Sequence, residues 1–147
     1  MRKAYRWLSY LLAIEVIVQA MVIAYAFAGL GKWVDDGHTL TKKVWSSDSP
    51  AFTGSGGLAF HGINGLMVMP LLAIVLLIVS LFAKVDGGTR RAAVLLGVVV
   101  LQVVLGLALH GVPLIASLHA LLAFGILAMA GMAGQRAADE VPAEAPS

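Results

Sequence analysis

Four long apolar segments constrain the fold of this 147-residue chain more than any other feature. They span residues 7–30, 58–83, 92–109 and 114–134 and carry few polar side chains. A helix needs about 20 predominantly apolar residues to cross a hydrocarbon core of about 30 Å, and each segment is close to or above that length. The chain is 60% hydrophobic and 12% charged, with a mean hydropathy of +0.92, which is typical of a membrane protein. Because backbone polar groups in lipid must pair internally, the sequence predicts an all-α fold, a transmembrane four-helix bundle of up-down-up-down topology.

The chain divides into one helical domain over residues 1–134 and a tail over residues 135–147. Gly29 and Gly31 form a helix-stop signal, which predicts that a polar outer loop follows over residues 31–57. Pro70 predicts a kink in the second helix. Only a short turn separates the third and fourth segments, so these helices should be antiparallel neighbours. The tail is acidic and rich in Pro and Ala, which predicts disorder.

Basic residues predict the orientation in the membrane. Seven of them fall on the side of the termini: Arg2, Lys3, Arg6, Lys84, Arg90, Arg91 and Arg136. The opposite side carries Lys32, Lys42 and Lys43, balanced by three aspartates. The positive-inside rule therefore predicts a multi-pass protein of the cell (plasma) membrane with both termini cytoplasmic. The net charge of +2 follows from this topology and gives no reason to expect a nucleic-acid partner.

The first segment has a second interpretation. Its basic start and the small residues of Ala24-Tyr-Ala-Phe-Ala28 resemble a signal peptide with a cleavage site. Its apolar run is long and continues to Leu30, which favours a retained membrane helix.

A faint internal repeat relates the two halves of the chain. Gln19 lies in the first helix and His61 near the start of the second, while Gln102 and His119 occupy the corresponding places in the third and fourth. Small residues follow both histidines at the first and fourth positions. This pattern indicates two repeated helical hairpins related by an axis along the membrane normal.

His61 and His119 are the residues best placed to bind a cofactor. Both should lie about 5 to 8 Å inside the outer membrane boundary, at 1.5 Å per residue. Their helices run in the same direction and are diagonal in the bundle, so the two imidazoles can face each other across its axis. This arrangement suits the two axial ligands of a haem b iron in a dry pocket. His110, at the outer end of the third helix, is an alternative ligand or a partner for a haem propionate.

Other interpretations of the histidines stay open. A histidine near a helix end is often an amphipathic interfacial residue with its polar edge in water, which suits His38 and His110. A zinc site built from three histidines is a further alternative, although no carboxylate lies near them in the apolar segments.

Glu15 is the costliest residue to place in a membrane. A carboxyl group in the first segment must be protonated, paired or hydrogen-bonded, and Gln19 lies one turn away on the same face. It is either a proton-handling or ligand-contacting group, or a neutral acid that bonds Gln102 or a backbone carbonyl. Asn64 and Ser117 can bond between helices in the same way. Counting from the helix ends places Glu15 and the histidines at different depths, which predicts two separate sites.

The sequence holds no catalytic set. It lacks a P-loop, a dinucleotide fingerprint, a nucleophile–base pair and a carboxylate pair, so a non-enzymatic protein is favoured. It also has no cysteine, which excludes disulfides, thiolate metal sites and covalent haem attachment.

The polar positions Gln19, His61 and Gln102, with the run Leu118-His-Ala-Leu-Leu-Ala-Phe124, resemble a family of small uncharacterised four-helix bacterial integral membrane proteins. More distantly, the chain is similar to one half-bundle of haem A synthase, whose halves hold histidines on their second and fourth helices. That resemblance implies haem binding at His61 and His119. The Glu-x-x-His-Arg pattern of that family is absent, because Leu58 and Gly62 occupy its Glu and Arg positions, and so is its cysteine pair. The resemblance therefore implies a haem-holding bundle and not haem A synthesis.

Three hypotheses follow. The first is a haem b-binding cytochrome-like or haem-handling accessory protein. The second is a cofactor-free structural or accessory membrane subunit, and the third is a small transporter that uses Glu15. In each case the lipid bilayer surrounds the chain, and a membrane-protein partner or a homo-oligomer is expected beside it.

Overall fold

Four long helices form the protein in the computed structural model, which describes residues 1–47, 51–108 and 112–140. The elements are α1 (Arg2–Asp35), α2 (Lys42–Trp45), α3 (Gly56–Ile63), the π-helix η1 (Asn64–Val68), α4 (Met69–Ala83), α5 (Gly88–Ala108) and α6 (Pro113–Asp139). The stretch from α3 to α4 is one continuous rod of 28 residues. This rod, α1, α5 and α6 are each long and apolar enough to span a membrane. The predicted all-α four-helix bundle is confirmed.

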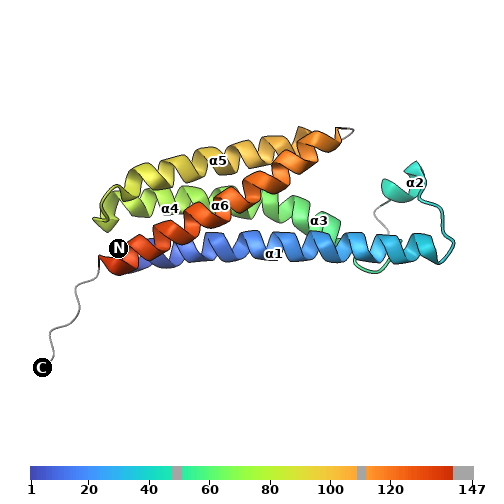
Figure 1. Ribbon diagram of the computed structural model, residues 1–147, viewed down its shortest axis with the longest axis horizontal. Coiled ribbons are helices and arrows are strands. Elements are labelled where there is room, and N and C mark those ends of the chain that lie inside the picture. Colours follow the sequence, from blue (N-terminus) through green and yellow to red (C-terminus); the bar gives the residue numbers. More distant parts are fainter. Residues whose placement is uncertain (48–50, 109–111, 141–147) are drawn as a thin grey trace, which may run out of the picture.

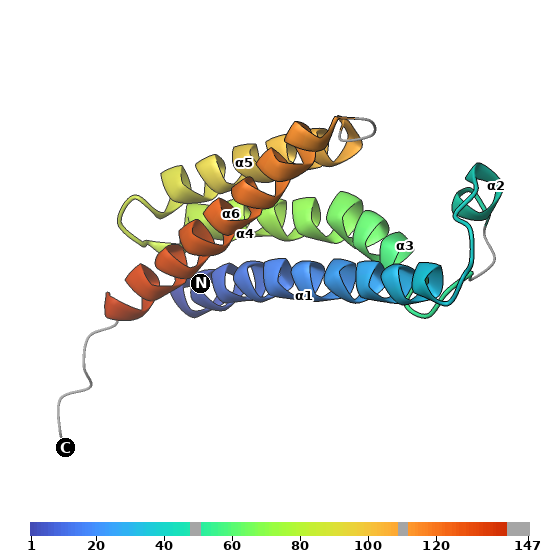
Figure 2. The ribbon, with the colours of Figure 1, turned by 45° about the vertical axis from the view of Figure 1, so that its right-hand side comes forward.

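Each long helix packs against two others and runs antiparallel to them (Figure 1). α1 contacts α6 and the α3–α4 rod, and α5 contacts α4 and α6. The rod is therefore diagonal to α6, as the up-down-up-down topology predicts. Figure 2 shows α6 crossing the bundle obliquely, from the end of α5 to the start of α1. We call the end that holds residues 1–10 and 130–140 the terminal end, and the end that holds residues 31–47 and 51–57 the loop end.

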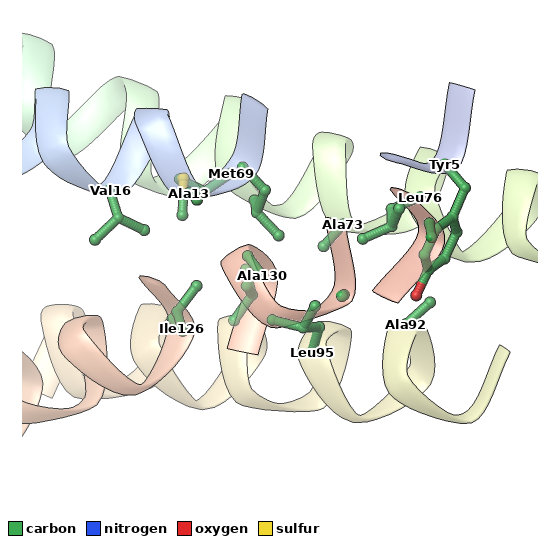
Figure 3. Close-up of a cluster of buried hydrophobic side chains, with 14 of the residues drawn as sticks. Tyr5, Ala13, Val16, Met69, Ala73, Leu76, Ala92, Leu95, Ile126 and Ala130 are labelled. Carbon is green, nitrogen blue, oxygen red and sulfur yellow. The ribbon is translucent and has the colours of Figure 1, made fainter. Parts of the chain in front are cut away.

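The packed core lies in the terminal half of the bundle. Val16, Met69 and Leu76 from α1 and α4 point toward Leu95 and Ile126 from α5 and α6 (Figure 3). In α6 the buried residues begin at Ile126, and among residues 112–124 every described side chain is at least partly exposed. The loop-end half of α6 therefore has a looser environment than the terminal half.

Small residues bring α6 and α1 close together. Ala130, Ala133 and Ala137 are completely buried, and a Cβ added at Gly134 would lie 2.6 Å from the Tyr10 ring. In a membrane there is little hydrophobic drive between helices, so close van der Waals packing over small residues supplies the attraction.

Several helix ends differ from the expected positions, and α1 already begins at Arg2 instead of 7. α1 does not stop at Gly29 or Gly31 but continues to Asp35, before Gly37 with φ of +91°. A glycine inside a helix lowers its stability by only about 1 kcal/mol. Gly29 and Gly31 therefore weaken the helix without ending it. α5 begins at Gly88 instead of 92, and α6 extends to Asp139, so the predicted tail starts inside a helix. Residues 141–147 of that tail lie outside the described residues.

Pro70 is accommodated by a widened turn. Proline has no N–H to donate to the fourth residue before it and its ring clashes with that carbonyl. The preceding turn, Asn64–Val68, is a π-helix in which the Met69 N–H bonds the Asn64 carbonyl. α3, on the far side of this turn, leans toward α1 (Figure 1). The turn thus directs the helix that carries His61.

Gly29 has a packing function that the sequence did not indicate. A Cβ at this position would lie 1.7 Å from the backbone oxygen of Thr53, whereas a Cβ at Gly31 would meet nothing within 4 Å. We expect Gly29→Ala to displace the returning loop from α1, and Gly31→Ala to stabilise the helix by about 0.5–1 kcal/mol. The rate of limited trypsin digestion at Lys42 and Lys43 measures how accessible the loop is to the protease. Faster cleavage should occur in Gly29→Ala alone, and equal cleavage rates in both variants would contradict the expectation.

Candidate functional site

His61 of α3 and His119 of α6 lie side by side although their helices are diagonal in the bundle. Their ring centroids are 6.2 Å apart and their planes make an angle of 69°. Both side chains are half-buried, and they lie just beyond the packed terminal half. The fold therefore brings together the two histidines that the sequence paired, which are 58 positions apart in the chain.

Each histidine is oriented by a backbone carbonyl of the helix that precedes it in its hairpin. His61 Nδ1 lies 3.3 Å from the Gln19 oxygen, and His119 Nδ1 lies 3.1 Å from the Gln102 oxygen. A carbonyl only accepts, so Nδ1 must be the protonated nitrogen of each neutral ring. The unprotonated Nε2 then carries the lone pair that can bind a metal.

The two hydrogen bonds are equivalent under the predicted internal repeat. In both hairpins, a histidine on the returning helix donates to the backbone of a glutamine on the outgoing helix. The matching positions of Gln19 and Gln102 in the sequence singled out these two residues. The sequence did not predict that their main-chain carbonyls would accept the hydrogen bonds. Backbone acceptors leave no signature in residue type, so only the structure could find this contact.

Gly106 brings α5 close to the His119 ring, and other glycines lie near the cluster. A Cβ at Gly106 would lie 3.1 Å from the His119 ring, and a Cβ at Gly65 would lie 3.8 Å from the Gln19 side-chain oxygen. Gly62, which follows His61, has nothing within 4 Å of a Cβ. Gly106 was not singled out in the sequence, although it precedes the short turn to α6.

Several buried polar atoms near the histidines have no hydrogen-bond partner among the described residues. They are both side-chain polar atoms of Gln19, the side-chain oxygen of Asn64 and the side-chain oxygen of Gln102. Gln19 and Asn64 are only 7% and 8% exposed. Buried amide groups without a partner are costly, so these atoms favour a polar occupant such as a water molecule or a ligand group.

Glu15 belongs to the same cluster as the histidines. Its carboxyl group is hydrogen-bonded to the Asn64 side-chain nitrogen, and Asn64 lies one helical turn from His61. Glu15 and His61 are therefore closer in depth than expected, about one helical turn apart, because the helix ends taken from hydropathy did not fix the register of α1 against the α3–α4 rod. The partner is Asn64 and not Gln102 or a backbone carbonyl. Ser117 bonds the Pro113 carbonyl of its own helix instead of a neighbouring helix.

The Glu15–Asn64 bond predicts unequal effects of two substitutions. Glu15→Gln should keep a hydrogen bond to Asn64 and change the free energy of unfolding by less than about 0.5 kcal/mol if the carboxyl is neutral. Asn64→Ala leaves the carboxyl without its partner and should cost about 1–2 kcal/mol. Unfolding in mixed micelles measures the change in unfolding free energy of both variants. A larger loss in Glu15→Gln than in Asn64→Ala would instead indicate that a charged carboxylate is needed.

Of the other two histidines, the structure describes only His38. His38, which follows α1 in the polar loop, stacks on Trp33 of α1 with ring centroids 4.8 Å apart. His110 lies outside the described residues. Within residues 1–47, 51–108 and 112–140, no group of three or more His, Asp or Glu side chains could hold a metal ion.

Together, four candidate spans and a polar cluster between apolar helices define a small integral membrane protein. Comparison with protein-family models, curated proteins and solved structures gave no match.

Proposed function

We propose that the chain is a haem b-binding membrane protein with His61 and His119 as the axial ligands. The observation that carries this proposal is the distance between the two imidazoles. A metal–imidazole bond is about 2 Å long, so two rings bound on opposite sides of one iron have centroids about 6 Å apart. The separation of 6.2 Å matches that requirement. The angle of 69° is compatible, because turning one ring about its metal–nitrogen bond leaves the bond length unchanged.

The second support is the orientation of both rings through Nδ1. Metal-binding histidines commonly donate their other N–H to a backbone carbonyl, which fixes the tautomer and raises ligand basicity. Gln19 and Gln102 supply such carbonyls to His61 and His119. The protein would thus have its ligands in the required tautomer before any metal arrives.

The surroundings also fit a flat ligand with polar edges. Gly106 adds no side-chain bulk beside the His119 ring, and Gly62, which follows His61, faces open space. The unpartnered amide group of Gln19 and the unpartnered side-chain oxygen of Gln102 offer hydrogen bonds to the polar periphery of a bound group. The partly exposed loop-end half of α6 provides a route for insertion that does not require opening the packed core.

A haem iron with two imidazole ligands has no open coordination position, so it would transfer single electrons and would not bind a substrate. The role of the chain's own residues is to hold, orient and shield the group. The basic residues at the terminal end favour cytoplasmic termini, which would place the histidines nearer the outer face.

A cofactor-free structural or accessory subunit is the second candidate. It is favoured by the direct contact of the two rings and by the hydrogen bond that each already makes. In this case the cluster would be a polar contact that holds diagonal helices together.

An absorption spectrum separates these candidates. The protein purified in detergent from haem-replete cells should show a Soret band, and sharp α and β bands should appear after reduction with dithionite. A colourless protein that also fails to bind added haemin would reject the haem proposal and leave the accessory subunit.

A further inference from the structure

Two adjoining cavities lie between α5 and α6 at the terminal end, far from the histidines. Their volumes are about 250 and 190 Å³. Arg91 and Met129 line both cavities. Arg90 lines the first and Arg136 the second, so three arginines line the two cavities, which we together call the hollow.

These arginines keep hydrogen-bonding capacity for a ligand. Across the described residues, none of the three forms an ion pair with a carboxylate. The nearby acids have other partners, since Glu140 accepts from the Asp86 N–H and Asp139 accepts from Gln135. An arginine has five N–H donors in a fixed fork, which matches the oxygens of a phosphate group.

Arg91 is held in place before any ligand binds. Its Nη1 donates to the Asp86 carbonyl at 2.6 Å. Fixing a side chain in advance lowers the entropy cost of binding. Arg90 and Arg136 are exposed and can close on the same ligand.

The remaining walls of the hollow are apolar. Val94 and Leu95 from α5 and Met129 and Met132 from α6 continue from the arginines toward the middle of the bundle. Met132 is 57% exposed and Val94 48% exposed, on helices long enough to span the bilayer. A ligand for this hollow needs an anionic head beside the arginines and an apolar body that extends toward the middle of the bundle.

We propose that this hollow binds an anionic phospholipid from the leaflet at the terminal end. The phosphate contacts Arg90, Arg91 and Arg136, and the acyl chains lie against Val94, Met129 and Met132. The volumes suit the phosphate and glycerol part of one lipid, not a whole lipid. Basic pockets between membrane helices are a recognised mode of headgroup binding.

The test is a titration of the purified protein in neutral detergent with phosphatidylglycerol, followed by thermal stability and native mass spectrometry. Phosphatidylglycerol should bind and raise the Tm, and phosphatidylcholine should do neither. Arg90→Gln/Arg136→Gln alters two exposed arginines and leaves the Arg91 contacts intact. Each charge removed should weaken binding about fivefold, so the double variant should bind about 25-fold more weakly.

Lys3→Gln/Lys84→Gln is the matched control, because it removes two exposed charges from the same end but outside the hollow. Its affinity should change less than about twofold, since screening weakens charges away from the site. An equal loss in both double variants would overturn the proposal in favour of general surface attraction. Equal protection by inorganic phosphate, or equal binding of phosphatidylcholine, would overturn it as well. The result is independent of haem binding.

Discussion

His61→Ala and His119→Ala should each abolish the spectrum of a haem held by two imidazoles. Removing either ring leaves the iron with one protein ligand, so the sharp α band of the reduced protein should be lost and the haem content should fall at least about tenfold. Reduced-minus-oxidised spectra and the haem-to-protein ratio measure both effects. The two variants should behave alike, because the rings occupy equivalent positions in the two hairpins.

His38→Ala is the matched control for this experiment. His38 lies in the loop, where its ring stacks on Trp33 near the end of α1. Its spectrum should equal that of the wild type. An unchanged spectrum in His61→Ala or His119→Ala would contradict the assignment and direct attention to His110, the remaining histidine.

Leu95→Ala should be among the most destabilising single substitutions in the bundle. Leu95 is fully buried where α5 faces α4 and α6, among the side chains in Figure 3. In a membrane, transferring an apolar side chain between protein and lipid contributes little, so the loss comes from the cavity that remains. At about 24 cal/mol per Å³, the missing volume should cost about 2 kcal/mol of unfolding free energy.

Leu101→Ala provides the comparison on the same helix. Leu101 is 49% exposed, so lipid chains can fill the space that its side chain leaves. We expect a change within about 0.5 kcal/mol. Unfolding in mixed micelles of increasing denaturing detergent measures both variants. If Leu101→Ala costs as much as Leu95→Ala, the exposed face of α5 must be covered by another chain, which would support a homo-oligomer.

Hydropathy predicted the number of long helices, and the short connections predicted which helices are neighbours. Each apolar segment became a helix that can span a membrane, and the short turn between α5 and α6 makes them antiparallel. The exact helix ends were less predictable, because glycine weakens a helix without necessarily ending it. Gly29 shows why: its role is to admit the backbone of Thr53, a contact 24 residues away in the sequence.

The pairing of His61 with His119 was also predictable from the sequence, since helix direction and depth follow from length and topology. Glu15 was not, because its relation to Asn64 depends on how α1 and the α3–α4 rod slide and rotate against each other. A shift of one helical turn along either axis moves a side chain by about 5.4 Å, and hydropathy does not resolve such a shift.

The sequence by itself thus determined that this is a four-helix membrane protein with two histidines on diagonal helices. Its long apolar segments must form helices in lipid, where backbone groups have to pair within the segment. Its short connections require consecutive helices to be antiparallel neighbours. Only the tertiary structure decided that Glu15, Gln19 and Asn64 join His61 and His119 in one cluster, and that carbonyls orient both rings. Register and main-chain hydrogen bonding arise from side-chain packing between helices, which no single segment encodes.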